Sequence, residues 1–231
     1  APAALALMGA LVEWLLIRPV YDGRADRPEE YSIMITFALS ILLLNLANSL
    51  FGPWPRRPEP LFRGGVELGE LIVSGDRLAA AGVAVLLITL LLAGLRYTWA
   101  GRAVRAVSQN REAAAIFGIS VTRVGMLAFA LGAALAGTAG ALMGPVFNVV
   151  PAMGVIPVIK AYVIVVLGGL GSIPGAIIGA IILGQVESFG TILIPDPSRA
   201  LAYKDAYGLV LLVGILLLRP QGLFGTKERR A

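Results

Sequence analysis

The sequence contains neither cysteine nor histidine. These two absences exclude disulfide bonds, thiol catalysis, the commonest metal ligands and the commonest general base. Charged residues are also scarce, at 14% of the chain, whereas soluble domains contain about 25%. Hydrophobic residues make up 58% of the chain. This composition predicts a protein whose surface faces mostly lipid.

Recognisable catalytic patterns are absent as well. The sequence has no Gly-x-x-x-x-Gly-Lys-[Ser/Thr] loop, so the chain does not by itself hold ATP in the usual way. It also shows no catalytic triad, metal-ligand cluster or carboxylate pair. We therefore expect no enzyme activity, no catalytic or metal site and no cofactor in this chain.

Long apolar runs divide the chain into seven candidate membrane spans. A spanning helix needs about 20 apolar residues. Backbone groups in lipid must be satisfied within the segment, which favours helices. The sequence therefore predicts an all-α, polytopic transmembrane bundle that forms a single domain over residues 1–231. The spans are 2–18, 32–52, 78–95, 121–144, 155–170, 174–194 and 206–219.

The first apolar run has no charged stretch ahead of it, as a signal peptide would. We interpret it as a true span and expect the chain to be part of a longer protein. Basic residues between the spans predict the orientation, because cytoplasmic loops are enriched in Lys and Arg. Placing loop 96–120 inside puts most of them, and the carboxyl terminus, on the cytoplasmic side. Loops 53–77, 145–154 and 195–205 then lie outside.

Small residues recur at helical spacing in two places. The first series is Gly132, Ala136, Gly140 and Gly144, with Ala133 and Gly137 beside it, and the second is Gly171, Gly175, Gly179, Ala180 and Gly184. Such faces let helix backbones approach closely. The pattern predicts tight packing within the bundle, and sliding of these faces during transport is the alternative.

A glycine-rich break over residues 167–175 interrupts the helical pattern. Pro174 disfavours helix just before it, and glycine adopts backbone angles that other residues avoid. The break is either a tight cytoplasmic turn or a gating turn of the transport path. On the second reading, Gly168, Gly169 and Gly171 are candidate gating residues.

The polar segment 98–120 is rich in helix formers and predicts a short amphipathic helical hairpin. Asn110, or Ser108 just before it, is expected to cap the second helix, and Gly118 to end it. One apolar stripe is expected along the hairpin, formed by Ala103, Ala106, Val107, Ala114 and Phe117.

This segment carries a resemblance. Glu112-Ala113-Ala114 followed by Gly118 resembles the Glu-Ala-Ala loop of bacterial ATP-binding-cassette (ABC) importer permeases. Together with Gly-Arg-Ala-Val-Arg-Ala from Gly101, the glycine break and Arg-Pro-Gln-Gly-Leu-Phe-Gly from Arg219, the chain resembles the branched-chain amino acid permease family. The resemblance implies that the loop docks into a groove of an ATPase subunit. Its expected coupling residues are Arg102, Arg105, Asn110, Glu112, Ala113, Ala114 and Gly118.

The resemblance also implies function, location and partners. The chain would be a permease subunit in a bacterial inner membrane that forms the translocation path for branched-chain amino acids or related small polar solutes. Its partners would be a second, paralogous permease, two ATP-binding subunits and an external solute-binding protein. Other amino acids, urea and amides remain open as substrates.

Polar residues within the spans are the remaining candidates. Lys160 and Glu187 lie at similar depths on neighbouring spans, so they either form an ion pair or reach interfacial water separately. Asn45 and Asn48 either bond a neighbouring helix or line a polar path. Glu13 is expected to reach the interface or to pair with Arg18. An ion- or proton-coupled secondary transporter that uses Lys160 and Glu187 is the alternative function, and a membrane scaffold is a third.

Overall fold

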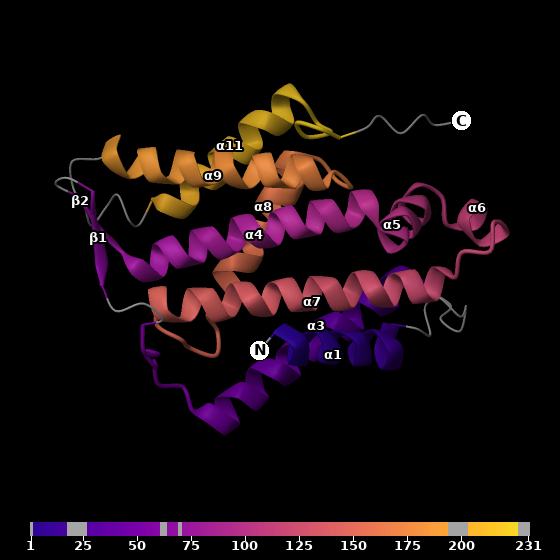
Figure 1. Ribbon diagram of the computed structural model, residues 1–231, viewed down its shortest axis with the longest axis horizontal. Helices are drawn as coiled ribbons and strands as arrows, with labels where there is room; N and C mark the ends of the chain where they lie inside the picture. The colour runs from indigo at the N-terminus through magenta and orange to yellow at the C-terminus, as the bar shows by residue number, and fades with distance from the viewer. Residues whose placement is uncertain (1, 18–26, 61–63, 69–70, 194–202, 226–231) are drawn as a thin grey trace. The chain divides into compact units, whose positions relative to one another are not determined.

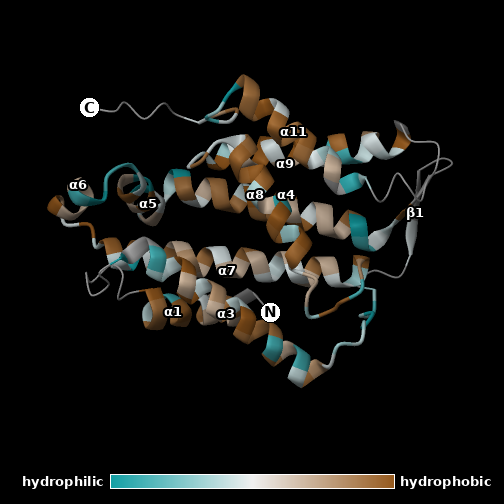
Figure 2. Ribbon diagram, turned by 180° about the vertical axis from the view of Figure 1, so that it is seen from behind, coloured by the Kyte–Doolittle hydropathy of each residue, from teal (hydrophilic) through white to brown (hydrophobic). Residues whose placement is uncertain are grey.

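The computed structural model describes residues 2–17, 27–60, 64–68, 71–193 and 203–225 (Figure 1). The chain forms two compact units, Ala1–Ala152 and Met153–Ala231. A helix stands at each of the seven predicted spans, and the prediction of an all-α transmembrane bundle is confirmed. Figure 2 shows hydrophobic residues along the helices and hydrophilic residues mainly in loops and at helix ends. The single domain over residues 1–231 stays a prediction.

Helix length separates the spans into two groups. Within the described residues, four helices are long and apolar enough to cross a membrane: Glu30–Phe51, Gly75–Tyr97, Val121–Val146 and Ile173–Ile192. Shorter apolar helices are Ala3–Ile17, Val155–Gly168 and Ala206–Leu218. These short helices coincide with the shortest of the predicted spans.

The first unit is built around two long helices that run side by side, α4 and α7 (Figure 1). Helix α1 packs along α7, and the short helices α5 and α6 lie between α4 and α7 in the sequence. The elements of this unit are α1 (Pro2–Val12), the π-helical turn η1 (Glu13–Ile17), α3 (Pro28–Phe51), α4 (Gly75–Tyr97), α5 (Trp99–Gln109), α6 (Arg111–Ile116) and α7 (Val121–Val146).

Small residues bring α1 and α7 into close contact. A Cβ added at Gly9 would overlap that of Ala133, and one added at Gly137 would overlap the side chain of Leu5. The predicted tight packing is therefore present. It uses Ala133 and Gly137, which lie beside the first series, while a Cβ at Gly132 or Gly140 would meet nothing within 4 Å.

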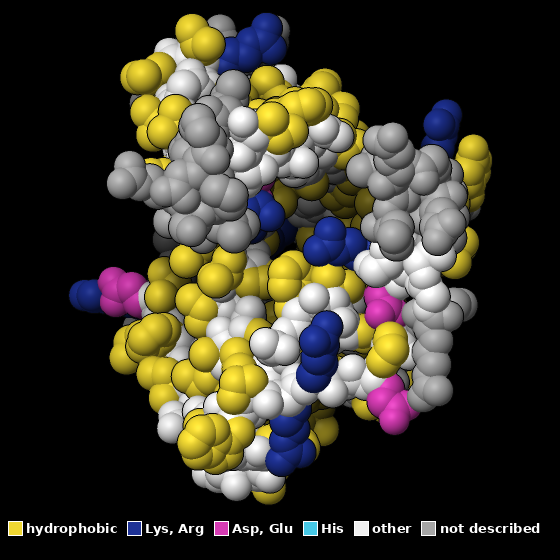
Figure 3. All heavy atoms as spheres, turned by 90° about the vertical axis from the view of Figure 1, so that its left-hand side faces the viewer, with side chains coloured by type: hydrophobic (Ala, Val, Ile, Leu, Met, Phe, Trp, Pro, Cys, Tyr) yellow, Lys and Arg dark blue, Asp and Glu magenta, His cyan; other side chains and the backbone are white. Residues whose placement is uncertain are grey.

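The loops at the far end of this unit from α5 and α6 are joined by backbone hydrogen bonds. Arg56 N donates to Val149 O over 3.0 Å, and Val149 N donates to Arg56 O over 2.8 Å. Loops 53–77 and 145–154, which the sequence predicts on the same side, therefore meet. Figure 3 looks onto the end of the molecule where β1 and β2 lie, and shows charged side chains in small separate groups among hydrophobic ones.

A short antiparallel hairpin lies in this loop, and the sequence pattern did not predict it. Strand β1 (Gly65–Leu68) pairs with β2 (Leu71–Ser74), with Gly65 opposite Ser74 and Leu68 opposite Leu71. Four-residue strands are too short to show a clear alternation, so the pattern was not visible in the sequence.

The second unit contains α8 (Val155–Gly168), α9 (Ile173–Leu193) and α11 (Lys204–Leu218). Helix α9 packs against both others. Glycines again set the spacing, because a Cβ at Gly179 would lie 3.0 Å from the Ile164 carbonyl oxygen, and one at Gly190 would lie 2.6 Å from the Tyr207 ring. Leu167 and Leu183 are buried within this unit.

Candidate functional site

The predicted helical hairpin of the polar loop is present as α5 and α6. The Thr98 hydroxyl accepts a hydrogen bond from Gly101 N over 3.1 Å at the start of α5. Asn110 Oδ1 accepts from Ala113 N over 2.9 Å and thereby caps α6. Gly118 follows α6 with φ +82°, a conformation that favours glycine. Asn110 and Gly118 thus define the two ends of α6, as predicted.

The hairpin is anchored through small residues and one arginine. Ala103 and Ala114 are 3% and 4% exposed, so both lie in the packed side of the hairpin as the predicted stripe requires. Arg105 Nη1 donates to the Leu95 carbonyl over 2.6 Å, which ties α5 to the last turns of α4. Arg102 and Glu112 are exposed and stand on the outer side of the hairpin.

The prediction for Phe117 is wrong. Its side chain is 85% exposed instead of joining the apolar stripe, and its neighbour Ile116 is 84% exposed. The short α6 turns its alanine face inward and leaves these two large side chains at its end. Neither Ile116 nor Phe117 is among the residues that were expected to contact the ATPase subunit. The available signal was a pair of large apolar residues after Ala113-Ala114-Ala115 in an otherwise polar loop.

The glycine break and the segment after α11 form one structure. Leu223 N donates to the Leu167 carbonyl over 2.9 Å, and Phe224 N donates to the Gly168 carbonyl over 3.1 Å. These bonds satisfy carbonyls that the end of α8 leaves without partners in the helix. We call residues 167–171 together with 219–225 the glycine clamp.

Close backbone contact in the glycine clamp depends on glycine itself. Gly169, Gly171 and Gly222 have φ values of +100°, +84° and +78°. A Cβ at Gly222 would lie 2.6 Å from Gly169 N and from Val166 O. Gly168 is packed equally closely against the backbone of Gly175. The geometry is that of a tight turn, and a gating role for Gly168, Gly169 and Gly171 stays a prediction.

Lys160 and Glu187 form an ion pair, which is the first of the two arrangements that the sequence predicted. Lys160 Nζ lies 2.7 Å from Glu187 Oε2, which joins α8 to α9. The Glu187 side chain is 9% exposed and the Lys160 side chain 29%. The pair therefore lies largely inside the second unit, with access from the lysine side. Its role in transport stays a prediction.

The other polar residues of the spans lie in the first unit. Asn45 Nδ2 donates to the Ile41 carbonyl of its own helix over 2.8 Å. Asn48 lies one turn further along α3 and is half-buried. Within the described part of the chain neither side chain bonds a second helix, and a role for Asn45 and Asn48 in the translocation path stays a prediction.

Glu13 differs from its expected position. It lies at the start of the π-helical turn η1 and is 1% exposed, so the interpretation that it reaches the interface is wrong. Single π-helical turns within α-helices occur frequently at functional sites. The predicted partner Arg18 lies outside the described residues.

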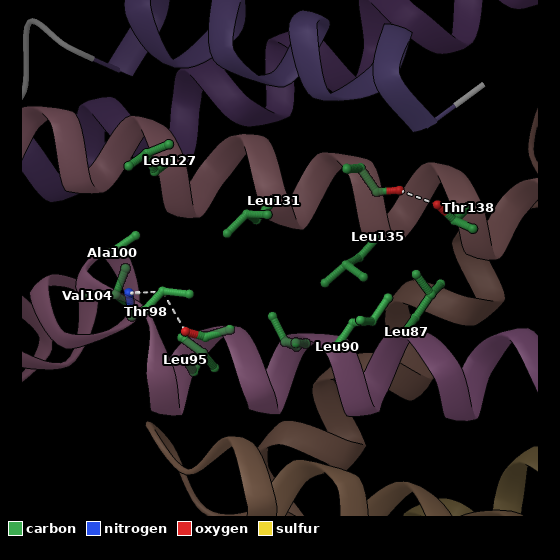
Figure 4. A pocket seen from close by; sticks show the side chains of 14 residues that line it. Leu87, Leu90, Leu95, Thr98, Ala100, Val104, Leu127, Leu131, Leu135 and Thr138 are labelled. Atoms are coloured by element: carbon green, nitrogen blue, oxygen red, sulfur yellow. Dashed lines mark hydrogen bonds between the residues drawn. The ribbon is translucent and has the colours of Figure 1, made fainter.

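A groove of about 490 Å³ runs between α4, α5 and α7. Leu90, Leu95, Leu131 and Leu135 point into it from the two long helices (Figure 4). Its polar side chains, Thr98 and Thr138, donate to carbonyls of Gly94 and Ala134 in their own segments. The groove therefore suits a hydrocarbon surface and offers little to a charged solute.

These features define the class of protein: a multi-pass membrane protein with a capped helical hairpin outside its spans and an ion pair within them. The family model described as branched-chain amino acid transport system, permease component, matches residues 2–218. The chain belongs to this family of transport permeases and is a transporter component rather than an enzyme.

Relatives named as branched-chain amino acid permeases are similar over nearly the whole chain. The high-affinity branched-chain amino acid transport system permease protein LivH of Salmonella typhimurium is 33% identical over 98% of this chain and 80% of its own. The corresponding protein BraD of Pseudomonas aeruginosa is 31% identical over 95% of this chain and 71% of its own. The ribose import permease protein RbsC of Bacillus subtilis is 33% identical over 60% of this chain and 46% of its own. No solved structure matches the chain.

Proposed function

We propose that this chain is the transmembrane permease subunit of an ABC importer, and that it forms the translocation path for branched-chain amino acids or related small polar solutes. ATP hydrolysis belongs to separate ATP-binding subunits. A second, paralogous permease and an external solute-binding protein complete the importer. The membrane is the bacterial inner membrane, with loop 96–120 and the carboxyl terminus in the cytoplasm.

The α5–α6 hairpin is the observation that carries this proposal. It is a compact, capped unit anchored to α4 and α7, so a push on its tip is transmitted to two long helices. The tip itself exposes Ile116 and Phe117 beside the charged Glu112. Exposed large apolar side chains on a polar segment mark a protein interface.

The family match supports the same function from another direction. Relatives that cover nearly all of this chain carry the names of branched-chain amino acid permeases. Relatives named for fructose and ribose import match shorter parts of it. This order favours an amino acid over a sugar as the solute.

Uptake into proteoliposomes tests the proposal. The chain is reconstituted with its partner subunits, ATP is supplied to the face that carries the ATP-binding subunits, and labelled L-leucine is delivered on the other. We expect uptake that requires ATP and continues when ionophores collapse all ion gradients. Uptake driven by a gradient without ATP would support the secondary transporter instead. No uptake under either condition would also refute the proposal.

A further inference from the structure

The buried ion pair of the second unit is poorly explained as a stabilising element. Removing a charge from water costs several kcal/mol, and the mutual attraction of a pair repays this cost only in part. Apolar residues of similar volume are often at least as stabilising. Charged residues within membrane spans therefore indicate a function in the first instance. Lys160 and Glu187 are such residues, on two apolar helices.

The surroundings of Glu187 leave part of its carboxylate available. Lys160 Nζ bonds Oε2, and among the described residues Oε1 has no hydrogen-bond donor. On the α11 side Oε1 faces Gly208, where a Cβ would lie 3.8 Å away. Because Gly208 has no side chain, α11 packs close to this oxygen, with Leu183 Cδ1 2.9 Å from the position that a Cβ would take.

The ion pair is more exposed at Lys160 than at Glu187. The Lys160 side chain is 29% exposed, whereas that of Glu187 is 9% exposed. Leu183 and Gly190 lie one turn away from Glu187 on either side and are buried against α11. The pair is therefore more open on the lysine side, and α11 covers the opposite side.

We propose that Lys160 and Glu187 form a binding site for a zwitterionic α-amino acid. The solute carboxylate binds the Lys160 ammonium, and the solute ammonium binds the Glu187 carboxylate. This inference rests on the proposed function, since it assigns the charged ends of the transported solute to named groups of the permease.

The physical reason is that a zwitterion can exchange with the pair without leaving a charge unpaired. Its two charges are separated by a single carbon atom, so each can face one partner of an ion pair whose atoms are 2.7 Å apart. Without solute, the Lys160 ammonium and the Glu187 carboxylate neutralise each other. With solute bound, the carboxylate of the solute neutralises Lys160 and its ammonium neutralises Glu187. A neutral sugar has no charge to replace either partner.

A cysteine substitution tests the site directly, because residues 1–231 contain no other cysteine. Lys160→Cys is prepared in the permease assembled with its ATP-binding and second permease subunits but without the solute-binding protein, whose own selectivity would otherwise intervene. The rate of labelling by 2-aminoethyl methanethiosulfonate is measured with and without L-leucine. The compared solutes are 4-methylpentanoate, which lacks the ammonium, and isopentylamine, which lacks the carboxylate. Lys204→Cys, on α11, is the matched control.

The expected result is selective protection by the ammonium-bearing solutes. In this variant Glu187 remains, so leucine and isopentylamine slow the labelling of Cys at position 160, and 4-methylpentanoate does not. At three times its dissociation constant a ligand slows labelling about fourfold. The reciprocal variant Glu187→Cys, labelled in the same way, is protected by leucine and 4-methylpentanoate but not by isopentylamine. Equal protection by all three solutes, or by none, would overturn the proposal.

The charge-reversed double variant Lys160→Glu/Glu187→Lys separates binding from structure. It restores an ion pair, so assembly is retained, but it reverses the orientation in which a zwitterion can bind. We expect leucine uptake by the complete importer to stay about tenfold or more below that of the unaltered importer. Leucine uptake at the level of the unaltered importer would show that Lys160 and Glu187 have only a structural role, and would overturn the proposal. Failure of the proposed function is distinguishable, since the unaltered importer would then show no ATP-driven uptake.

Discussion

The backbone N–H of Leu223 donates to the carbonyl of Leu167 over 2.9 Å, so the segment after the last helix caps the end of α8. Two sequence features some fifty residues apart are thereby one structural element. Each was a separate motif in the sequence, and each leaves backbone groups unsatisfied when considered alone. Their meeting explains why both are rich in glycine.

Gly222→Ala should loosen the glycine clamp. Gly222 has φ +78°, and an added Cβ would lie 2.6 Å from two backbone atoms. We expect the free energy of unfolding in detergent to fall by about 1–3 kcal/mol beyond the cost of the backbone angle alone. Gly171→Ala is the matched control, because Gly171 has φ +84° but open space around it. An equal loss of unfolding free energy in the two variants would show that the close contact at Gly222 contributes nothing to stability.

Asn110→Ala should weaken α6 without unfolding the protein. The variant loses the hydrogen bond from Ala113 N to Asn110 Oδ1. Loss of such a cap costs about 1 kcal/mol, so amide hydrogen exchange within α6 should accelerate about fivefold. Asn110→Asp should retain slow exchange. The control is Ser108→Ala, because the Ser108 hydroxyl donates to the Arg105 carbonyl and caps no helix. The cap assignment fails if both alanine variants behave alike.

Ile116→Ser/Phe117→Ser should weaken the attachment of the ATP-binding subunit. Both side chains are more than four-fifths exposed, so the fold should not change. Apolar anchors at an interface contribute about 2 kcal/mol or more each, and affinity should fall at least about thirtyfold. Phe147→Ser is the control, since Phe147 is 56% exposed just after the other end of α7. Unchanged affinity, measured by co-purification and titration, would exclude this surface as the docking tip.

Gly9→Leu should destabilise the contact of α1 with α7. An added side chain would overlap Ala133, which lies on the facing helix. Overpacking of this kind costs about 1–3 kcal/mol, and thermal unfolding in detergent should shift accordingly. Gly140→Leu makes the same change on α7 where a Cβ would meet nothing within 4 Å. Comparable destabilisation by the two variants would contradict the packing described for Gly9.

The sequence predicted much of this architecture from local physics. Membrane spans require continuous apolar runs, and the helices stand where those runs occur. Helix α6 was bounded correctly because a capping side chain and a left-handed glycine act on neighbouring residues. The hairpin β1–β2 was missed because its strands are four residues long, which is too few for a periodic signal.

Side-chain placement was harder to predict. Phe117 was assigned to the apolar stripe on helical spacing, but α6 ends at Ile116 and the chain turns before Phe117 can join that face. Glu13 was expected near the interface, yet it is buried at the start of the π-helical turn. Both outcomes depend on where a helix ends or widens, and the hydrophobic period does not determine this.

The sequence by itself determined that the chain is a bundle of membrane helices and which short segments interrupt it, because solvent preference and capping are local properties. It also restricted Lys160 and Glu187 to similar depths. Only the tertiary structure decided that these two charges meet over 2.7 Å, and that the Leu167 and Leu223 segments join. Such pairings depend on which helices become neighbours and on how closely glycine lets them approach, and both are properties of the packed chain.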